Sequence, residues 1–311
     1  MFAKWGKSAS RRIPPHGLCL LVPAAPSVVP ARQGGTAWWC ASLSAARSGR
    51  ATVSAKHPWN GSGDVAVRDG GTLWVCDFDG TLYRGWLARF THGISNTDLF
   101  WQVFLRCPGW QRRWRLLKGG HRVHALHRQL LQQRRAGAIS SGEVDAQCVQ
   151  ALRQLFCQEA NEWQIQHAGE ALARGFAPQA ATVLQRWLGP TDRVLVLSKA
   201  FMPVLLPACL HLSALLNRPV DVVGNRLTGD DGVLRSEDKQ RELRAFLEGY
   251  SCARAVVIGD TEEDIGMHRT LTDLGIASRL VAMSPKDPRI RAEADLVLPS
   301  WRHAMEHPFG E

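Results

Sequence analysis

The chain has 311 residues, a hydrophobic fraction of 45% and a formal net charge of +10 at pH 7. This length allows two domains with a sizeable core, and the composition suits a globular protein. No run of about 20 apolar residues is present, so no membrane-spanning helix is expected. Eight scattered cysteines, without a Cys-x-x-Cys pair, argue against a zinc site and a disulfide framework and favour a reducing compartment.

Residues 1–68 are rich in Ala, Ser, Pro, Gly and Arg and lack a sustained hydrophobic period, so we expect them to be disordered and dispensable for catalysis. Eight Lys and Arg residues precede the first acid, Asp64, so the basic balance belongs mostly to this segment. Its composition resembles an organellar transit peptide, and the alternative is an extension from an upstream start codon. We expect a cytoplasmic protein, or a mitochondrial or plastid one if the segment is a targeting signal.

The next stretch predicts a short buried strand, Leu73–Cys76, which ends at two carboxylates, Asp77 and Asp79, followed by Gly80. Because side chains alternate along a strand, we expect both carboxylates to point the same way. They would repel each other unless a cation lay between them. The alternative is a surface turn, since Asp and Gly are common turn residues.

Residues 88–174 predict an almost wholly helical insertion that separates the first strand from the next. Apolar residues recur at the helical period from Asp98 onward. A second helix is expected to be broken at Gly119–Gly120, and a third to begin at a cap that includes Ser140. We expect this insertion to form a cap domain over the end of the first strand.

The first half of the insertion is strongly basic, with a single acid, Asp98. Most of its basic side chains should be solvated, but some should point toward the cleft and favour an anionic substrate. Replacement of Arg112 and Arg115 by Glu is therefore expected to raise KM. The basic residues are Arg106, Arg112, Arg113, Arg115, Lys118, Arg122, Arg128, Arg134 and Arg135.

From residue 175 onward, apolar strands alternate with helices, which predicts a parallel sheet with right-handed crossovers. The fold class is therefore α/β, with a Rossmann-like core formed by residues 69–87 and 175–311. A hairpin is expected around residues 229–232. The expected strands are Arg193–Leu197, Val220–Val223, Arg254–Ile258, Leu280–Met283 and Leu296–Leu298.

Reactive residues follow the ends of three strands. The first strand ends in Asp77 and Asp79, the second in Ser198, and the third in a segment that holds Asp260 and Asp264. Lys239 lies near the start of the helix before the third strand. In this order and spacing, these elements resemble the haloacid dehalogenase superfamily of phosphohydrolases, from about residue 72 to the C-terminus. Asn225-Arg226-Leu227, Asp231-Gly232 and Lys239 resemble its phosphoserine-phosphatase-like branch.

The resemblance implies a Mg²⁺-dependent phosphohydrolase that cleaves a small phosphate monoester and forms an aspartyl-phosphate on Asp77. Asp79 is expected to protonate the leaving oxygen and later to deprotonate water. Mg²⁺ removes the repulsion between the anionic nucleophile and its dianionic substrate. The expected metal ligands are Asp77, Asp79 through its backbone carbonyl, Asp260, and Asp264 directly or through water. The expected phosphate contacts are Thr81, Ser198 and Lys239.

Several of these residues have structural alternatives. Ser198 would also serve as a helix cap, Lys239 as a solvated helix lysine, and Asp264 as an acid at a helix N-terminus. Lys199 is a rival for the catalytic lysine, and it departs from the family pattern, which more often has a small residue there.

Other functions stay open at this stage. A phosphomutase shares both aspartates, and a non-catalytic binding module would keep the same fold. A dehalogenase needs no acid at position 79, and no nucleic-acid motif accompanies the positive charge. Tyr83-Arg84-Gly85-Trp86 offers no glutamate, so serine phosphate is not favoured. Neither the substrate nor the oligomeric state follows from the sequence.

Overall fold

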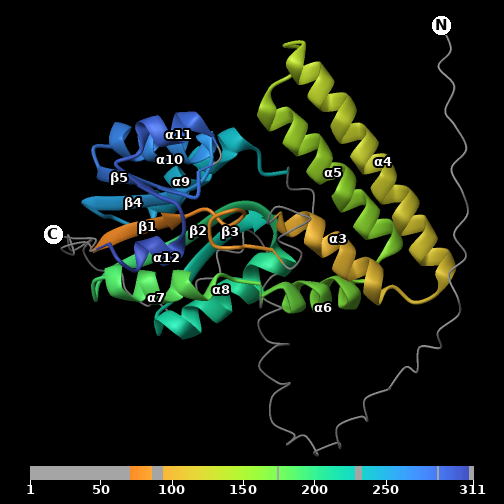
Figure 1. The fold of residues 1–311 in the computed structure, drawn as a ribbon, viewed down its shortest axis with the longest axis horizontal. Coiled ribbons are helices and arrows are strands. Elements are labelled where there is room, and N and C mark those ends of the chain that lie inside the picture. Colours follow the sequence, from red (N-terminus) through yellow and green to blue (C-terminus); the bar gives the residue numbers. More distant parts are fainter. Residues whose placement is uncertain (1–70, 86–93, 174, 228–232, 286, 308–311) are drawn as a thin grey trace, which may run out of the picture. The chain divides into compact units, whose positions relative to one another are not determined.

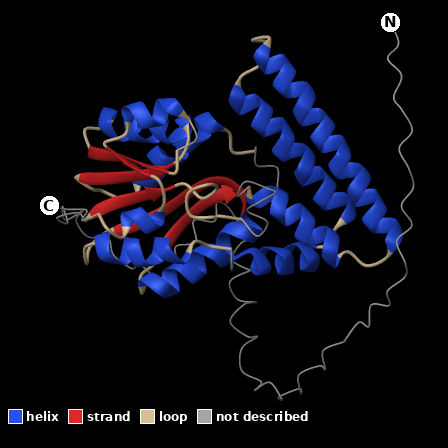
Figure 2. Ribbon diagram, viewed as in Figure 1, coloured by secondary structure: helices blue, strands red, loops and turns tan. Residues whose placement is uncertain are grey.

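The structure is a computed structural model that describes residues 71–85, 94–173, 175–227, 233–285 and 287–307 (Figure 1). The expectations for residues 1–68 and for the hairpin at 229–232 lie outside these residues. The predicted α/β class is confirmed, because six parallel strands form one sheet that is flanked by helices (Figure 2). None of the helices in the described part of the chain is long and apolar enough to cross a bilayer.

The strand that precedes Asp77 lies in the middle of the sheet. The strand order is β3-β2-β1-β4-β5-β6, so the chain builds outward from β1 first on one side and then on the other. Because β1 is covered on both faces, its residues after Thr72 form an uninterrupted apolar run. The strands are β1 (Thr72–Cys76), β2 (Arg193–Phe201), β3 (Val220–Asn225), β4 (Arg254–Gly259), β5 (Ala277–Met283) and β6 (Leu296–Leu298).

Two layers of helices cover the sheet. Trp74 and Cys76 belong to the apolar cluster on one face, whereas Leu73 and Val75 belong to the cluster on the other, as alternation along β1 requires. The first face packs against α7 (Pro178–Trp187), α8 (Met202–Leu216) and α12 (Trp301–Ala304). The second face packs against α9 (Ser236–Glu248), α10 (Glu262–Asp273) and α11 (Pro288–Glu293).

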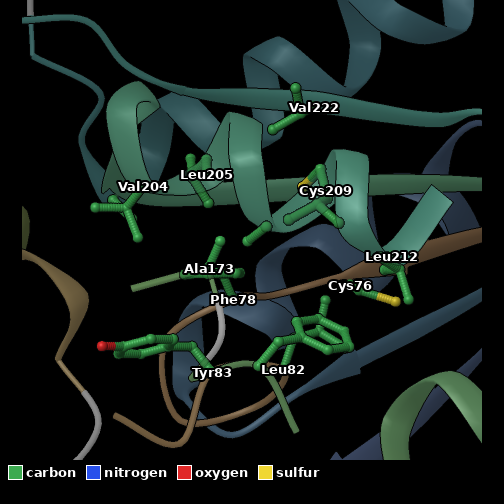
Figure 3. Packing of buried hydrophobic residues seen from close by; sticks show 14 of the residues in the cluster. Cys76, Phe78, Leu82, Tyr83, Ala173, Val204, Leu205, Cys209, Leu212 and Val222 are labelled. Atoms are coloured by element: carbon green, nitrogen blue, oxygen red, sulfur yellow. The ribbon is translucent and has the colours of Figure 1, made fainter. Parts of the chain in front are cut away.

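The insertion is helical, as predicted, and part of it shares the core of the sheet. Its helices are α3 (Ser95–Arg106), α4 (Trp110–Arg135), α5 (Ser141–Glu159) and α6 (Glu162–Ala173). Ala173 of α6 lies in the same buried cluster as Val204 and Leu205 of α8 (Figure 3). A Cβ at Gly169 would lie 1.8 Å from the backbone oxygen of Pro203, so glycine allows α6 and α8 to approach closely.

The expected break at Gly119–Gly120 is wrong, because α4 runs without interruption through both glycines. A Cβ at Gly119 would lie 2.2 Å from Leu155 of α5, and one at Gly120 would lie 2.5 Å from Phe100 of α3. The glycines therefore serve close packing of α4 between two helices, not a change of chain direction. The predicted cap at Ser140 is confirmed, since its hydroxyl accepts a hydrogen bond from the N–H of Glu143 at 3.1 Å.

Candidate active site

The carboxyl ends of three neighbouring strands meet at one edge of the sheet. Asp77 directly follows β1, Ser198 lies in β2, and Asp260 directly follows β4. The N–H of Asp77 donates to the backbone oxygen of Ile258 at 2.9 Å, which extends the pairing of β1 with β4. The strand order reverses at this place, and open parallel sheets bind ligands at such a point.

Gly80 allows the loop after β1 to pass close to Asp260. Its φ is +83°, and a Cβ there would lie 2.2 Å from Oδ2 of Asp260. A side chain at position 80 would therefore meet both a strained backbone and this carboxylate. The glycine that predicts a sharp turn after the two aspartates also brings the loop and Asp260 together.

Asp77, Asp260 and Asp264 form a buried carboxylate cluster. Each offers one oxygen, and these oxygens all lie within 4.8 Å of one another. None of the three residues is more than 5% exposed. Carboxylates so close together repel one another unless cations or protons lie between them, and carboxylate oxygens are the ligands that Mg²⁺ prefers. The donor set therefore suits a hard divalent cation.

Asp264 uses its two carboxylate oxygens differently. Oδ2 accepts hydrogen bonds from the N–H groups of Asp260 at 2.9 Å and Thr261 at 3.0 Å, which forms a capping box at the start of α10. The alternative of a helix-terminal acid is therefore confirmed for this oxygen. Oδ1 lies 3.7 Å from Nζ of Lys239, inside the cluster. Burial holds the pKa of Asp264 above its usual value, although the charge of Lys239 opposes this shift.

Lys239 supplies positive charge inside the acidic cluster. Its side chain is buried, and its Nζ donates to Oδ1 of Asp77 at 2.8 Å. Burial alone would lower the pKa of Lys239, but the carboxylates of Asp77, Glu263 and Asp264 raise it well above its usual value. The alternative of a solvated lysine is therefore wrong, and Lys239 stays an ammonium next to Asp77.

The cluster, the two lysines beside it and the acids that pair with them carry an excess of negative charge. If all these groups are ionised, five carboxylates face two ammonium groups, which leaves three negative charges unbalanced. A bound divalent cation would offset most of this excess, which is a second reason why the residues fit a metal. The carboxylates are Asp77, Asp145, Asp260, Glu263 and Asp264, and the ammonium groups are Lys199 and Lys239.

The carboxylate of Asp79 turns away from this cluster toward the insertion. It accepts hydrogen bonds from the N–H of Ser95 at 2.9 Å and from its hydroxyl at 3.0 Å. Burial raises the pKa of Asp79 to about 7, although both bonds from Ser95 lower it. Asp79 is therefore a carboxyl group that changes protonation near neutral pH. The expected role of Asp79 as a metal ligand stays a prediction.

The first turn of α3 holds the loop after β1 in two places. Besides the Ser95–Asp79 bonds, the hydroxyl of Tyr83 donates to Oδ2 of Asp98 at 2.7 Å in a buried position. Asp98, the single acid in the basic half of the insertion, thus lies inside the protein and not on its surface. Sequence reasoning misses Ser95, because no local pattern connects it with a partner that lies 16 positions earlier.

Ser198 lies in an irregular part of β2. The strand continues beyond its expected end to Phe201, and its register with β3 shifts between Leu197 and Phe201. The buried hydroxyl of Ser198 accepts a hydrogen bond from the N–H of Ala200 at 3.2 Å. This bond leaves the hydroxyl proton for another acceptor. The alternative of a helix cap is wrong, because the residue at the N-cap of α8 is Phe201.

Lys199 connects the insertion with the sheet. Its Nζ donates to the carboxylates of Asp145 on α5 and Glu263 on α10. Burial opposes the charge of Lys199, but Glu263 and Asp145 nevertheless raise its pKa. Lys199 is thus not the lysine that contacts Asp77. Glu263 lies between Lys199 and Lys239 and pairs with both.

Thr81 belongs to the loop after β1 and is buried. Its backbone oxygen accepts a hydrogen bond from Nε1 of Trp301 at 2.8 Å. Its hydroxyl oxygen is buried and has no hydrogen-bond partner among the described residues. A buried polar atom of this kind requires a ligand or water to satisfy it. The expected contact of Thr81 with phosphate stays a prediction.

A cavity with a volume of about 1210 Å³ adjoins the carboxylate edge. Asp79 and Lys199 line it on the side of the sheet, and residues of α3, α4 and α5 form its other walls. Two cationic side chains of α4, Lys118 and Arg122, also line it. The cavity therefore leads from the candidate catalytic residues into the basic half of the insertion.

The choice of Arg112 and Arg115 as residues that face the cleft is wrong. Neither belongs to the described lining of the cavity, and Nε of Arg115 pairs with Oε2 of Glu159 at 2.8 Å. The helix turns by about 100° per residue, so only some of its cations face one side. Lys118 and Arg122, which are four positions apart, share the side that faces the cavity.

Comparison with protein families assigns the chain to one of them. Residues 74–269 match the profile of the haloacid dehalogenase-like hydrolases. The chain belongs to this family. The match covers the end of the strand that precedes Asp77 and the segment with Asp260 and Asp264, so it includes the strand ends that build the carboxylate edge. No curated protein sequence matches this hydrolase.

Solved structures also resemble this haloacid dehalogenase-like hydrolase. A protein of unknown function from Bordetella pertussis is 15% identical, with a TM-score of 0.48, over 74% of this chain and 98% of that one. L-2-haloacid dehalogenase from Xanthobacter autotrophicus is 12% identical, with a TM-score of 0.38, over 74% of this chain and 95% of the dehalogenase. A phosphoserine phosphohydrolase-like protein from Francisella tularensis is 16% identical, with a TM-score of 0.34, over 76% of this chain and 98% of that protein. None of these likenesses assigns a substrate to the chain.

Proposed function

We propose that this hydrolase cleaves phosphate monoesters, with Asp77 as the nucleophile and Mg²⁺ as the cofactor. The observation that carries the proposal is the contact of Lys239 with Asp77 at 2.8 Å beside two further buried carboxylates. A carboxylate held between an ammonium group and a metal site can approach a dianionic phosphate, because the positive charges offset the repulsion.

The reaction would proceed in two steps at Asp77. First, a carboxylate oxygen of Asp77 attacks phosphorus, the bond from phosphorus to the ester oxygen breaks, and Asp79 gives its proton to the departing alkoxide. Then Asp79 takes a proton from water, whose oxygen attacks the aspartyl-phosphate and releases inorganic phosphate. One phosphate monoester and one water thus yield one alcohol and one phosphate. A pKa of about 7 suits a group that both gives and takes a proton.

The remaining residues would bind and orient the phosphoryl group. Ser198 retains a hydroxyl proton for donation, and Thr81 has a buried hydroxyl without a hydrogen-bond partner among the described residues. The ammonium group of Lys239 would neutralise charge that develops on the phosphoryl oxygens. When bound, Mg²⁺ would be held by Asp77, Asp260 and Asp264, with the predicted support of Asp79, and would polarise the phosphoryl group.

We further propose that residues 88–174 act as a cap domain, and that the chain belongs to the phosphoserine-phosphatase-like branch. The cavity between α3, α4, α5 and the sheet supports the cap, since a covered site limits access of stray water. The link from Asp145 through Lys199 to Glu263 would hold the cap near the site. The catalytic core would then comprise residues 69–87 and 175–311.

The replacement Asp77→Asn tests the proposed function. It keeps the shape of the side chain but removes the nucleophile, so hydrolysis of p-nitrophenyl phosphate should fall at least about 10³-fold. A matched variant, Asp273→Asn, changes an exposed aspartate of α10 and should keep the wild-type rate. Release of inorganic phosphate distinguishes hydrolysis from transfer by a phosphomutase. Wild-type rates in Asp77→Asn would contradict the mechanism.

Thermal unfolding tests the metal independently of turnover. Saturating Mg²⁺ should raise Tm of the wild-type protein, because an ion bound to the folded state stabilises it by about 2.7 kcal/mol at 100 times Kd. The increase should be absent in Asp260→Asn and present in Asp273→Asn. An equal increase in both variants would place the ion elsewhere.

A further inference from the structure

The cavity beside Asp79 is much larger than a phosphate group with a small alcohol requires. Its volume is about 1210 Å³, whereas cavities that enclose drug-sized ligands measure about 300–1,000 Å³. Asp79, which would protonate the departing oxygen, is itself part of the lining. The cavity therefore begins where the alcohol part of a substrate would leave the phosphate.

Most of the surface of the cavity is apolar, and its polar lining includes three histidines of α4 besides the charged residues named above. The apolar part of the lining comprises Phe100 and Trp101 of α3, Trp114 and Leu117 of α4, and Leu152 of α5, among others. Trp101, Trp114 and Leu117 are 36%, 45% and 36% exposed, respectively. Large apolar side chains that gather at one concave place and stay exposed mark a binding surface.

The aromatic side chains are held in place by one another. The ring of Trp101 packs edge-to-face with the rings of Phe100 and Phe104, with ring centroids 5.3 Å and 5.7 Å apart, respectively. The ring of Trp114 stacks on that of Trp110, with ring centroids 6.1 Å apart. Binding of an apolar ligand to such a wall requires little ordering of side chains and releases water from apolar surface.

We propose that this cavity binds the leaving group of the substrate, and that this group is a long, mostly apolar alcohol. The inference rests on the proposed phosphohydrolase function and adds the substrate class, a phosphate monoester of a fatty or isoprenoid-type alcohol. The phosphate lies at the carboxylate edge, and the hydrocarbon part extends between α3 and α4. A small polar alcohol such as serine would leave this apolar wall in contact with water.

A series of alkyl phosphates tests the substrate class. Ethyl, butyl, hexyl, octyl and decyl phosphate are assayed with Mg²⁺ below the concentrations at which they form micelles. Each methylene that enters the cavity should raise kcat/KM by about fourfold, as expected from about 0.8 kcal/mol per buried methylene. Adenosine 5′-monophosphate, which is bulky but polar, should be a poorer substrate than decyl phosphate. A flat series, or a preference for the nucleotide, would overturn the inference.

Two tryptophan variants test the location. Trp114→Ala removes part of the wall and should lower the ratio of kcat/KM for decyl phosphate to that for ethyl phosphate by about tenfold. Trp163→Ala, a matched change at a 61% exposed tryptophan of α6 outside the described lining, should leave the ratio unchanged. The same ratio in Trp114→Ala as in the wild type would place the alkyl chain elsewhere and overturn the inference.

Binding to Asp77→Asn separates the inference from the proposed function. Calorimetry with Mg²⁺ should show that decyl phosphate binds this variant at least about 100-fold more tightly than ethyl phosphate does. If no phosphate monoester is hydrolysed by the wild type but this difference holds, the proposed function fails and the binding site stands. If hydrolysis occurs but both esters bind equally, the inference fails and the proposed function stands.

Discussion

At the edge of the sheet, Asp77 and Lys239 are buried and in contact, whereas Trp101 and Trp114 in the wall of the cavity remain partly exposed. The edge is assembled by strand ends and by the first turns of α9 and α10, which hold Lys239 against Asp77. The wall is assembled by α3, α4 and α5, whose side chains contact mainly one another. The difference indicates that the edge determines whether the reaction occurs, and that the wall determines which alcohol is released.

Loss of the buried ammonium should have the largest effect. Lys239→Met leaves Asp77, Glu263 and Asp264 without this counter-charge, so kcat should fall about 10³-fold. The free energy of unfolding without metal should also fall, by about 3 kcal/mol, because charges are left buried without a partner. Urea unfolding with and without Mg²⁺ measures this change.

Lys118→Met, at an exposed lysine, should alter the free energy of unfolding by less than about 0.5 kcal/mol. Equal effects of both changes would contradict the role of Lys239.

Ser95 connects the two regions, and its removal should have an intermediate effect. Ser95→Ala deletes one of the bonds that favour the ionised form of Asp79, so the pKa of Asp79 should rise above about 7. The protonated acid then persists to higher pH, and the alkaline limb of kcat/KM should move upward. At pH 7, kcat should fall about two- to tenfold, because Asp79 loses an orienting contact. Ser95→Thr, which restores the hydroxyl, should reverse both changes, whereas an unmoved alkaline limb would exclude this role of Ser95.

Charge reversal on α4 should have the smallest effect. Lys118→Glu combined with Arg122→Glu should raise KM for an anionic substrate about three- to tenfold at low ionic strength, and the increase should shrink as salt rises. The matched pair Arg112→Glu and Arg115→Glu, outside the described lining, should leave KM unchanged. If both pairs raise KM equally, the positive charge acts at long range and not within the cavity.

The sequence predicts the carboxylate edge because its aspartates directly follow predicted strands along the chain. Asp77 and Asp260 follow strands, so the parallel sheet brings them together whatever the loops between them do. The same reasoning assigns Lys239 through its position before β4. It does not predict that the carboxylate of Asp79 turns toward Ser95, because this depends on where α3 begins relative to the loop.

The cavity is harder to predict, since it depends on how three helices face one another. Glycine disfavours the helical conformation, so the pair Gly119–Gly120 predicts a break when the sequence of α4 is considered alone. Only the neighbouring Leu155 and Phe100 show why glycine is needed there. Likewise, the sequence does not show which cations of α4 face the cavity. This depends on where α3 and α5 pack against α4, and in the structure Lys118 and Arg122 line the cavity.

The central place of β1 also affects how the protein folds. Thr72 pairs with Arg254 and Leu73 with Arg193, so the strand that precedes the nucleophile finds its neighbours only after most of the chain has been made. At about 5–20 residues per second, the interval between synthesis of β1 and of β4 is roughly 10–40 s. The contacts between α4 and α5 are local in sequence and can form within that time. During synthesis, the helical hairpin that walls the cavity can therefore precede the carboxylate edge that it adjoins. The four apolar residues Leu73–Cys76 have no sheet neighbour until β2 emerges, and they lack their second neighbour until β4 emerges.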